Sequence, residues 1–329
     1  MLELLAPAGS PESVRAAVKN GADAVYMGFG DFNARRNAKN FTDEEFSELT
    51  EYCRVRGVKV YLTLNTLLSD REFPAALDLL NKAARMGVDA VIVQDLGLLR
   101  AVKKAVPDLP IHASTQMSVH NLDGVKKLAE LGASRVVLAR ELTREEIAYI
   151  CRNSPIEIEV FCHGALCMSY SGQCYMSSVI GRRSGNRGLC AQPCRLSYDL
   201  GPKANEYPLS LKDLCLINHI KDLEKCGVSC LKIEGRMRRP EYVAIVTRIY
   251  RKAISEGLSP TREDLRELEL AFSRQGFTDG YFTNSKGRHM FGIREETERE
   301  PDIFAKARRE YMSGDAERVP VRFYCIVRE

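Results

Sequence analysis

Four cysteines lie close together in one stretch of the chain, and their spacing favours a metal centre. Cys167, Cys174, Cys190 and Cys194 follow one another as Cys-x6-Cys-x15-Cys-x3-Cys. The segment around them is rich in Gly and Ser, which is typical of a connection between elements. Packing alone explains four such thiols poorly, and disulfides are rare in the reducing compartment that we expect for this protein. We therefore expect these thiolates to bind a metal.

The spacing leaves more than one kind of centre open. Zinc sites usually contain paired cysteines about two to four residues apart, and only Cys190 and Cys194 are spaced in this way. An iron–sulfur cluster tolerates a less regular spacing, so we interpret the four cysteines as cluster ligands, with zinc and unligated thiols as the alternatives. Cys215 is a fifth candidate and could replace Cys194 as the fourth ligand.

The elements that must position these cysteines alternate regularly along the chain. Apolar, β-branched runs predict strands at 2–5, 24–27, 58–64, 90–93, 111–113, 135–138, 156–161 and 230–233. Helical patterns follow them at 11–20, 42–56, 72–86, 98–104, 122–131, 143–151, 210–226 and 241–255. Eight strand–helix units indicate an α/β fold and favour closure into a TIM-like (β/α)8 barrel, with a doubly wound sheet as the alternative.

One connection of this barrel is far longer than the others. The predicted barrel covers 1–256 and includes the Cys-rich loop 162–209 after the seventh strand, which a bound metal would help to order. Residues 257–329 form a C-terminal extension with a helix at 259–273 and irregular structure beyond it. A strand pattern at 319–327 indicates the possible start of a further domain.

Polar side chains gather where the chemistry of such barrels takes place. Active sites lie at the carboxyl ends of the strands. Candidate site residues at these ends are Asn33, Arg35, Gln94, Gln116, Arg140, His163, Lys232, Glu234 and Arg236. Each of these residues could have a purely structural role in a turn, a cap or the core. For His163 a structural role and a functional role are equal alternatives. Taken together, the residues predict a functional site at this end of the barrel.

The Cys-rich loop is also basic. No acidic residue separates its arginines, which are Arg182, Arg183, Arg187 and Arg195. If the barrel closes, this loop neighbours the cations at the end of the eighth strand, and such a rim suits a phosphate-bearing or carboxylate substrate. Solvated arginines on an ordinary surface loop are the alternative. Tyr170 and Tyr175 offer weaker signs of a stacking surface for a splayed base.

Composition limits the remaining function classes. The chain has 329 residues, 45% of them hydrophobic, and a net charge of +4, so any anionic partner must bind a local patch. The chain lacks a signal-peptide pattern and an apolar run of about 18 residues, so we expect a cytoplasmic protein without a membrane partner. Neither a His-Glu-x-x-His motif nor a nucleophile elbow occurs, so hydrolytic machinery is not visible.

Several of these motifs resemble one known family. They are His163-Gly-Ala-Leu-Cys-Met-Ser-Tyr-Ser-Gly-Gln-Cys174, Gly188-x-Cys190-Ala-Gln-Pro-Cys194-Arg195 and Lys232-Ile-Glu-Gly-Arg-Met237. The opening Leu5-Ala-Pro-Ala-Gly9, Gly21-Ala-Asp-Ala-Val-Tyr26 and His112-Ala-Ser-Thr-Gln-Met117 agree with them. From residue 1 to about residue 255 the chain resembles peptidase family U32, first described as collagenase-like proteases.

The resemblance implies a specific chemistry. Better-understood members are oxygen-independent hydroxylases that act on a tRNA wobble uridine, a 23S rRNA cytidine or a ubiquinone precursor, with prephenate as the implied oxygen donor. The family pattern implies Cys167, Cys174, Cys190 and Cys194 as ligands of a four-iron, four-sulfur (4Fe-4S) cluster. The Ala-Gln-Pro-Cys-Arg motif most resembles the rRNA cytidine hydroxylase branch, although members of that branch continue into a further domain where this chain ends.

The resemblance also suggests roles at the mouth. Arg35, Arg140 or Arg236 would bind the carboxylates of the oxygen donor, and Glu234 or His163 would move the proton released from the base, with Lys232 beside them. Arg182, Arg183 and Arg187 would bind the RNA. A collagenase-like peptidase is the alternative enzyme, and an RNA-binding protein with a structural cluster is the alternative outside catalysis. The sequence leaves the oligomeric state open.

Overall fold

The structure is a computed structural model that describes residues 2–33, 41–200, 203–235, 238–293 and 301–312. Two predicted site residues, Arg35 and Arg236, and the predicted strand at 319–327 lie outside these described residues.

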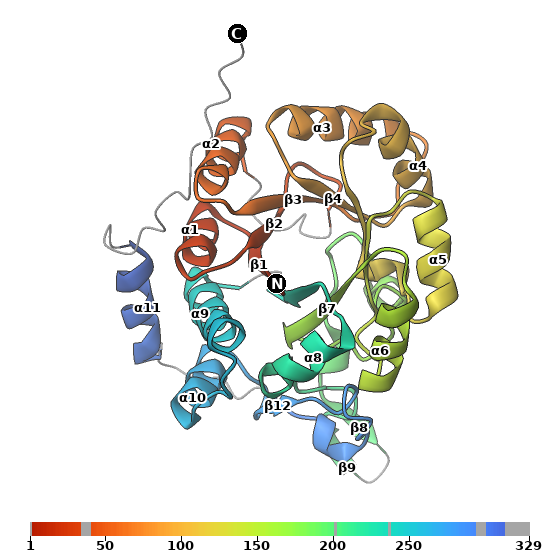
Figure 1. The fold of residues 1–329 in the computed structure, drawn as a ribbon. Helices are drawn as coiled ribbons and strands as arrows, with labels where there is room; N and C mark the ends of the chain where they lie inside the picture. Colours follow the sequence, from red (N-terminus) through yellow and green to blue (C-terminus); the bar gives the residue numbers. More distant parts are fainter. Residues whose placement is uncertain (1, 34–40, 201–202, 236–237, 294–300, 313–329) are drawn as a thin grey trace.

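Eight parallel strands close into a barrel (Figure 1). They are β1 (Glu3–Ala8), β2 (Ala24–Gly28), β3 (Lys59–Leu64), β4 (Ala90–Val93), β5 (Ile111–Ala113), β6 (Arg135–Val137), β7 (Glu157–Gly164) and β11 (Cys230–Ile233). Each strand pairs in parallel with the next, and Leu231 of β11 lies opposite both Val160 of β7 and Leu4 of β1. This double pairing closes the sheet and confirms the predicted (β/α)8 barrel.

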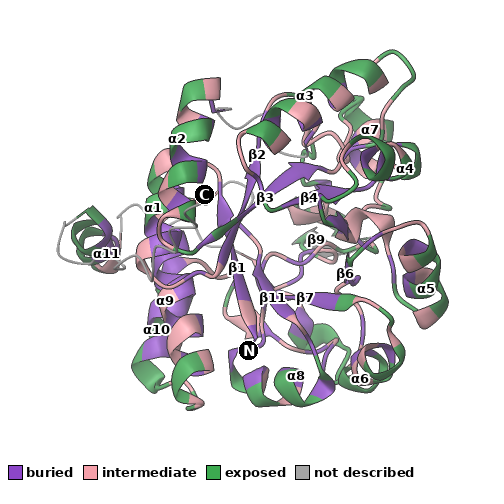
Figure 2. Cartoon of the chain, turned by 45° about the horizontal axis from the view of Figure 1, so that its top comes forward, coloured by how far each residue is buried: buried purple, intermediate pink, exposed green. Residues whose placement is uncertain are grey.

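Helices surround the barrel in the predicted order. They are α1 (Pro11–Lys19), α2 (Asp43–Arg54), α3 (Phe73–Arg85), α4 (Leu96–Ala105), α5 (Leu122–Glu130), α6 (Arg144–Asn153), α8 (Ile220–Cys226) and α9 (Pro240–Glu256). Thr42 and Thr143 form capping boxes with Glu45 and Glu146, which satisfy backbone N–H groups at the helix starts. Figure 2 shows buried strands inside and helices whose outer faces are exposed.

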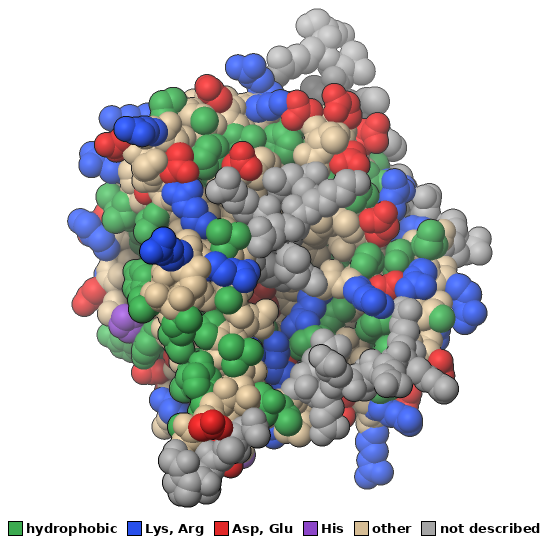
Figure 3. All heavy atoms as spheres, turned by 180° about the vertical axis from the view of Figure 1, so that it is seen from behind, with side chains coloured by type: hydrophobic (Ala, Val, Ile, Leu, Met, Phe, Trp, Pro, Cys, Tyr) green, Lys and Arg blue, Asp and Glu red, His purple; other side chains and the backbone are tan. Residues whose placement is uncertain are grey.

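The surface is hollowed over one end of the barrel. Figure 3 shows the molecule from behind relative to Figure 1, and Lys and Arg side chains border a hollow near its centre. The carboxyl ends of β6, β7 and β11, which carry most of the candidate site residues, come together at one end of the barrel because these strands are parallel neighbours.

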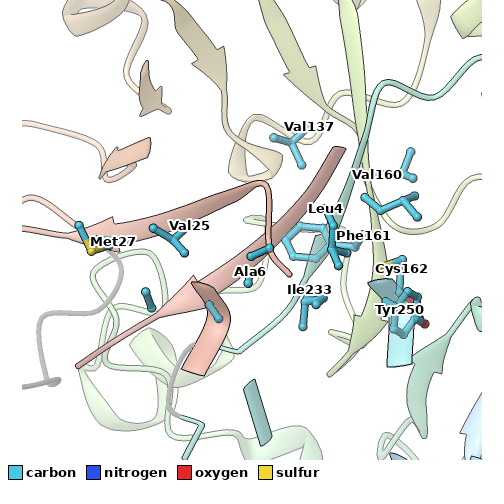
Figure 4. Packing of buried hydrophobic residues seen from close by; sticks show 14 of the residues in the cluster. Leu4, Ala6, Val25, Met27, Val137, Val160, Phe161, Cys162, Ile233 and Tyr250 are labelled. Atoms are coloured by element: carbon cyan, nitrogen blue, oxygen red, sulfur yellow. Dashed lines mark hydrogen bonds between the residues drawn. The ribbon is translucent and has the colours of Figure 1, made fainter. Parts of the chain in front are cut away.

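Apolar side chains fill the layer between the strands and the helices. Figure 4 shows Leu4, Ala6, Val160, Ile233 and other members of this core close together. Successive side chains of a strand point to opposite faces, so the alternate residues point into the barrel. A smaller apolar cluster containing Leu5, Tyr26 and Tyr61 forms there.

Charged side chains also lie inside the barrel. Arg135 is buried and donates to Glu3 at 2.6 Å, to Glu157 at 2.8 Å and to Glu159 at 3.3 Å. Lys232 is buried as well and donates to Glu159 at 2.8 Å. Burial of a charge is costly unless the charge is paired, so these contacts hold β1, β6, β7 and β11 in a common register.

The connection between β7 and the next barrel strand is built from several small elements. It contains α7 (Met176–Gly181), a 3-10 turn (Pro193–Arg195) and a hairpin of β8 (Tyr198–Leu200) and β9 (Lys203–Glu206). We call residues 165–209 the insertion, because β7 continues to Gly164, two residues beyond the predicted start of the loop.

The prediction of one long helix at 210–226 is wrong. Instead β10 (Asp213–Cys215) forms first, with Leu214 opposite Gly164 of β7 in an antiparallel pair and opposite Thr278 of β12 (Phe277–Thr278) in a parallel pair. A 3-10 turn (Ile217–His219) follows, and α8 begins only at Ile220. The apolar spacing of this segment fits either structure, and the pairing with distant β7 and β12 selects the strand.

Residues beyond α9 pack against the barrel. They form α10 (Arg262–Ala271), β12, a 3-10 turn (Arg288–Met290) and α11 (Asp302–Met312). Arg308 donates to Glu241 of α9 at 2.7 Å, and Arg274 donates to both carboxylate oxygens of buried Asp213 at 2.7 Å. The boundary at residue 256 stays a prediction. No helix among the described ranges is long and apolar enough to cross a membrane.

Candidate functional site

The four cysteines of the insertion lie in one region. Cys167 follows β7, Cys174 precedes α7, and Cys194 lies in the 3-10 turn after Cys190. A Cβ placed on Gly185 would lie 3.7 Å from the Cys174 carbonyl oxygen and 3.8 Å from the Cys190 Cβ atom, so both segments meet at this glycine. Cys194 interacts electrostatically with Cys190 and Cys174, and Cys167 interacts with Cys174 and Cys194.

Burial and charge act in opposite directions on these thiols. Burial raises the pKa of Cys167 and of Cys194, while Arg140 partly offsets this for Cys167 and Arg195 does so for Cys194. Thiols with a raised pKa hold their protons near neutral pH, and a metal would displace those protons on binding. The nearby cations would then offset the negative charge of the thiolates.

The donor set itself indicates the kind of group that it could hold. No carboxylate occurs in the sequence between Glu159 and Asp199, so this region offers sulfur ligands, which suit iron–sulfur clusters and zinc. Across the described ranges, no three His, Cys, Asp or Glu side chains are arranged to hold a single metal ion. A cluster spreads its thiolates around a larger inorganic core, whereas zinc draws sulfurs to about 2.3 Å from one centre.

Cys215 lies in a different environment. Its Sγ atom is 3.8 Å from the Tyr250 hydroxyl, and burial raises its pKa to about 11. The thiol of buried Cys162, on β7, is an electrostatic neighbour. These contacts place Cys215 beside the wall of the barrel and leave Cys194 as the better-placed fourth ligand.

Arg140 and Glu234 form an ion pair at the carboxyl ends of β6 and β11. Arg140 donates to Glu234 Oε2 at 2.6 Å and to the Ala165 carbonyl oxygen at 3.1 Å, and its guanidinium lies 3.9 Å from the centre of the Phe161 ring. Because Arg140 also partly offsets the rise in the pKa of Cys167, this arginine connects the barrel mouth to the cysteine region.

Gln94 and Gln116 hold the insertion over the barrel. Asn186 donates from its side-chain amide to Gln116 Oε1 at 2.8 Å and to Gln94 Oε1, and it accepts from the Leu67 N–H at 3.1 Å. Gln116 donates in turn to the Asn65 carbonyl oxygen at 2.9 Å. These two candidate site residues therefore anchor Asn186, which sequence reasoning missed because no local pattern marks it.

The arginines of the insertion have different environments. Arg187 donates to Glu72 Oε2 at 2.8 Å and to the Leu67 carbonyl oxygen at 2.9 Å, so it joins the insertion to the start of α3. Arg182 and Arg183 are exposed, and Arg183 Nε donates to the Leu189 carbonyl oxygen at 2.9 Å.

The Glu72–Arg187 contact predicts a pH-dependent anchor. Hydrogen bonds from Arg187 and Ser69 lower the pKa of Glu72 to about 2, so the ionised form supports the anchor above the ordinary carboxyl pKa of 4.5. Protonation as the pH falls from 4.5 towards 2 removes this support. We expect Glu72→Gln to accelerate hydrogen exchange around Asn186 at pH 7, whereas Glu44→Gln on the outer face of α2 should leave it unchanged. Equal exchange in both variants would contradict the anchor.

The remaining described candidates are buried. Asn33 donates to the Gly30 carbonyl oxygen at 2.8 Å, and Lys232 pairs with Glu159 inside the barrel. His163 is 1% exposed, and its Nδ1 lies 3.4 Å from the Tyr250 hydroxyl. The rings of Tyr242, Tyr250 and Phe277 surround it, with centroids 5.2 to 6.1 Å away. This environment resembles that of a core histidine.

Burial of His163 predicts a pH dependence of stability. Burial, with a smaller effect of Arg238, lowers the pKa of His163 to about 3, below the ordinary value of 6.5. Between these values the unfolded chain binds a proton that the folded chain does not, so the free energy of unfolding falls as the pH decreases below 6.5. His163→Gln is expected to reduce this dependence by up to about 1.4 kcal/mol per pH unit in urea titrations. An unchanged dependence would show that folded His163 already carries the proton.

Comparison with known proteins supports one family. The model of peptidase family U32 matches residues 9–291. The tRNA hydroxylation protein P1 of Bacillus subtilis (strain 168) is 38% identical, covering 88% of this chain and 73% of that protein. A collagenase of Porphyromonas gingivalis (strain ATCC BAA-308 / W83) is 37% identical, covering 86% and 74%. The 23S rRNA 5-hydroxycytidine synthase of Escherichia coli (strain K12) is 39% identical, covering 86% of this chain and 43% of that protein.

A solved structure agrees with the fold. The structure of a U32 peptidase has a TM-score of 0.52 at 16% identity, covering 71% of this chain and 94% of that chain, which supports the barrel fold alone. The family model spans most of the chain, and the relatives match it over nearly the same length. This chain belongs to peptidase family U32.

Proposed function

We propose that this protein is an iron–sulfur-dependent, oxygen-independent hydroxylase of an RNA base, either a tRNA uridine or a 23S rRNA cytidine. The main support comes from two relatives, which are 38% and 39% identical to this chain. One is named for hydroxylation of tRNA and the other for synthesis of 5-hydroxycytidine in rRNA. The four neighbouring thiols of the insertion support the cofactor part of the proposal.

Cys167, Cys174, Cys190 and Cys194 would hold a 4Fe-4S cluster, with zinc as the alternative. When bound, the cluster would supply redox or Lewis-acid chemistry beside the barrel mouth. Asn186 and Arg187 anchor the middle of the insertion to the barrel, between Cys174 and Cys190 in the sequence. Substrate RNA and a small carboxylate would therefore meet at one place.

The oxygen donor must supply more than an oxygen atom. Replacing a carbon–hydrogen bond with a carbon–hydroxyl bond oxidises the base by two electrons, so without dioxygen the donor must accept those electrons. Prephenate, a dicarboxylate, is the donor that the family resemblance implies. Arg140 is the described cation best placed to bind one of its carboxylates, because it lies at the mouth and next to the cysteine region.

Glu234 is the base that we assign to the proton released from the RNA. Its carboxylate accepts from Arg140 at 2.6 Å, at the end of β11. His163 is a weaker candidate because it is buried behind three aromatic rings. The arginines of the insertion would bind the phosphates of the RNA. We place the reaction in the cytoplasm.

Mass spectrometry of nucleosides tests the reaction directly. Ribosomal RNA and tRNA from a strain that lacks this protein should lose one hydroxylated pyrimidine, which plasmid-borne wild-type protein restores and Glu234→Gln protein does not. A control substitution at Glu263, exposed on α10, should restore the nucleoside fully. An unchanged set of modified nucleosides in the deletion strain would exclude the proposed function.

A peptidase remains the second candidate because one relative is named collagenase. It predicts cleavage of denatured collagen by purified protein, and this cleavage should survive replacement of all four insertion cysteines. Loss of cleavage together with the cysteines, or its absence from the wild-type protein, would remove this candidate.

A further inference from the structure

The segment between Glu159 and Asp199 is basic and contains no acidic residue of its own. Between Glu159 and Asp199 the chain has four arginines and no Asp or Glu. Two of the arginines are engaged in the protein, because Arg187 binds Glu72 and Arg195 donates to the carbonyl oxygens of Leu211 and Leu166. The outward charge of this segment therefore comes from Arg182 and Arg183, which have no acidic partner within the described ranges.

Helix α7 presents these arginines beside an exposed ring. Tyr175 is its N-cap and Arg182 its C-cap, and Val179 lies between them. Tyr175 and Val179 are four positions apart and so share one side of the helix, and Arg182 and Arg183 directly follow its last turn. Tyr175 is 64% exposed and Val179 is 81% exposed. We call Tyr175, Val179, Arg182 and Arg183, which are all exposed within nine residues of the chain, the strip.

The strip lies next to the cysteine region. Tyr175 directly follows Cys174, and Ser177 of α7 has its Oγ atom 3.7 Å from Cys190 Sγ. The same hydroxyl oxygen accepts from the Ala191 N–H at 3.0 Å, which fixes α7 against the Cys190 segment. A second ring, that of Tyr170, is 52% exposed and lies 5.6 Å from the ring of His120.

We propose that Tyr170, Tyr175, Val179, Arg182 and Arg183 form a docking surface for the unpaired RNA nucleotides that flank the target base. This inference rests on the proposed function. Exposed rings stack on bases of any sequence, arginines bind phosphates, and the absence of acids avoids repulsion of the RNA backbone. Stacking requires splayed bases, so the surface should bind single strands and loops in preference to duplexes.

Binding of defined RNA tests this surface. The probe is a short fluorescein-labelled single-stranded RNA, with the duplex of the same sequence for comparison, and fluorescence anisotropy is measured at several salt concentrations. Tyr175→Ala should weaken binding of the single strand about 5- to 100-fold. Arg182→Gln/Arg183→Gln should lower the slope of log affinity against log salt by about 1.4, because each lost phosphate contact of a single strand contributes about 0.7.

The matched control is Arg262→Gln/Arg266→Gln. Both arginines are exposed on α10, which lies across the barrel from the side of α3 and α4 where Figure 2 shows α7. This variant loses the same charge and should bind RNA as the wild type does. Thermal unfolding of every variant should match that of the wild type, since the altered side chains are exposed.

The outcomes separate the surface from the reaction. Unchanged RNA binding in Tyr175→Ala and Arg182→Gln/Arg183→Gln would overturn the docking surface, as would a wild-type protein that binds no RNA. A membrane-binding patch would instead show lost binding to phosphatidylserine vesicles in these variants with RNA binding intact, which also overturns the proposal. If the deletion strain keeps all its hydroxylated nucleosides while RNA binding depends on the strip, the docking surface stands and the proposed reaction fails.

Discussion

Replacing Cys167, Cys174, Cys190 or Cys194 singly with Ser is expected to lower bound iron severalfold and to abolish restoration of the hydroxylated nucleoside. A hydroxyl is a poorer ligand for iron–sulfur clusters than a thiolate, and loss of one ligand opens the centre to water and oxidation. Iron and acid-labile sulfide are measured after anaerobic purification, and nucleosides are measured in the deletion strain carrying each variant.

Cys215→Ser is the informative control for this series. Cys215 interacts with Tyr250 and Cys162, so its substitution should leave iron and nucleoside levels near those of the wild type. If Cys215→Ser loses iron and Cys194→Ser retains it, Cys215 rather than Cys194 is the fourth ligand. This result would contradict the ligand set proposed above.

Replacing Lys232 with Met is expected to lower the free energy of unfolding by about 3–5 kcal/mol. The substitution leaves the Glu159 carboxylate, which is fully buried, without its nearest cation, and Arg135 remains 3.3 Å away while shared with Glu3 and Glu157. Removing one partner of a buried pair costs this much because the other charge stays desolvated. Urea denaturation measures the change.

A double variant separates a structural role of Lys232 from a catalytic one. Lys232→Met/Glu159→Gln removes both charges and should recover much of the lost stability. If Lys232→Met instead abolishes the nucleoside while stability is unchanged, the lysine acts in the reaction, as the sequence alone had suggested. Arg54→Met, exposed on α2, serves as a control that should change stability by less than about 0.5 kcal/mol.

Local patterns were sufficient to predict the barrel. Each strand is a short apolar run between a glycine or polar turn and a capped helix, so its position depends on neighbours in sequence. The prediction of a helix at 210–226 was wrong because the first part of this segment pairs with Gly164 and Thr278, which lie far away in the chain. The periodicity of apolar residues within a segment gives no information about such a distant partner.

The sequence indicated which residues lie near the site better than it indicated what each of them does there. Four rare thiols in one connection are the signal that singled out the cysteines, which lie in one region with Arg140 near Cys167, and their role as ligands stays a prediction. Gln94 and Gln116 lie at the mouth, where both bind Asn186, whereas Lys232 precedes the last residue of β11 and pairs with Glu159 inside the barrel. Strand alternation places Lys232 inside the barrel, a distinction that depends on exact register.

The most direct test of the account is the content of anaerobically purified wild-type protein. Iron and acid-labile sulfide should each be present at about four per chain, with a brown absorbance that disappears in Cys190→Ser, because four thiolates ligate a 4Fe-4S cluster. A colourless protein that binds stoichiometric zinc, or one that binds no metal while still restoring the hydroxylated nucleoside, would contradict it.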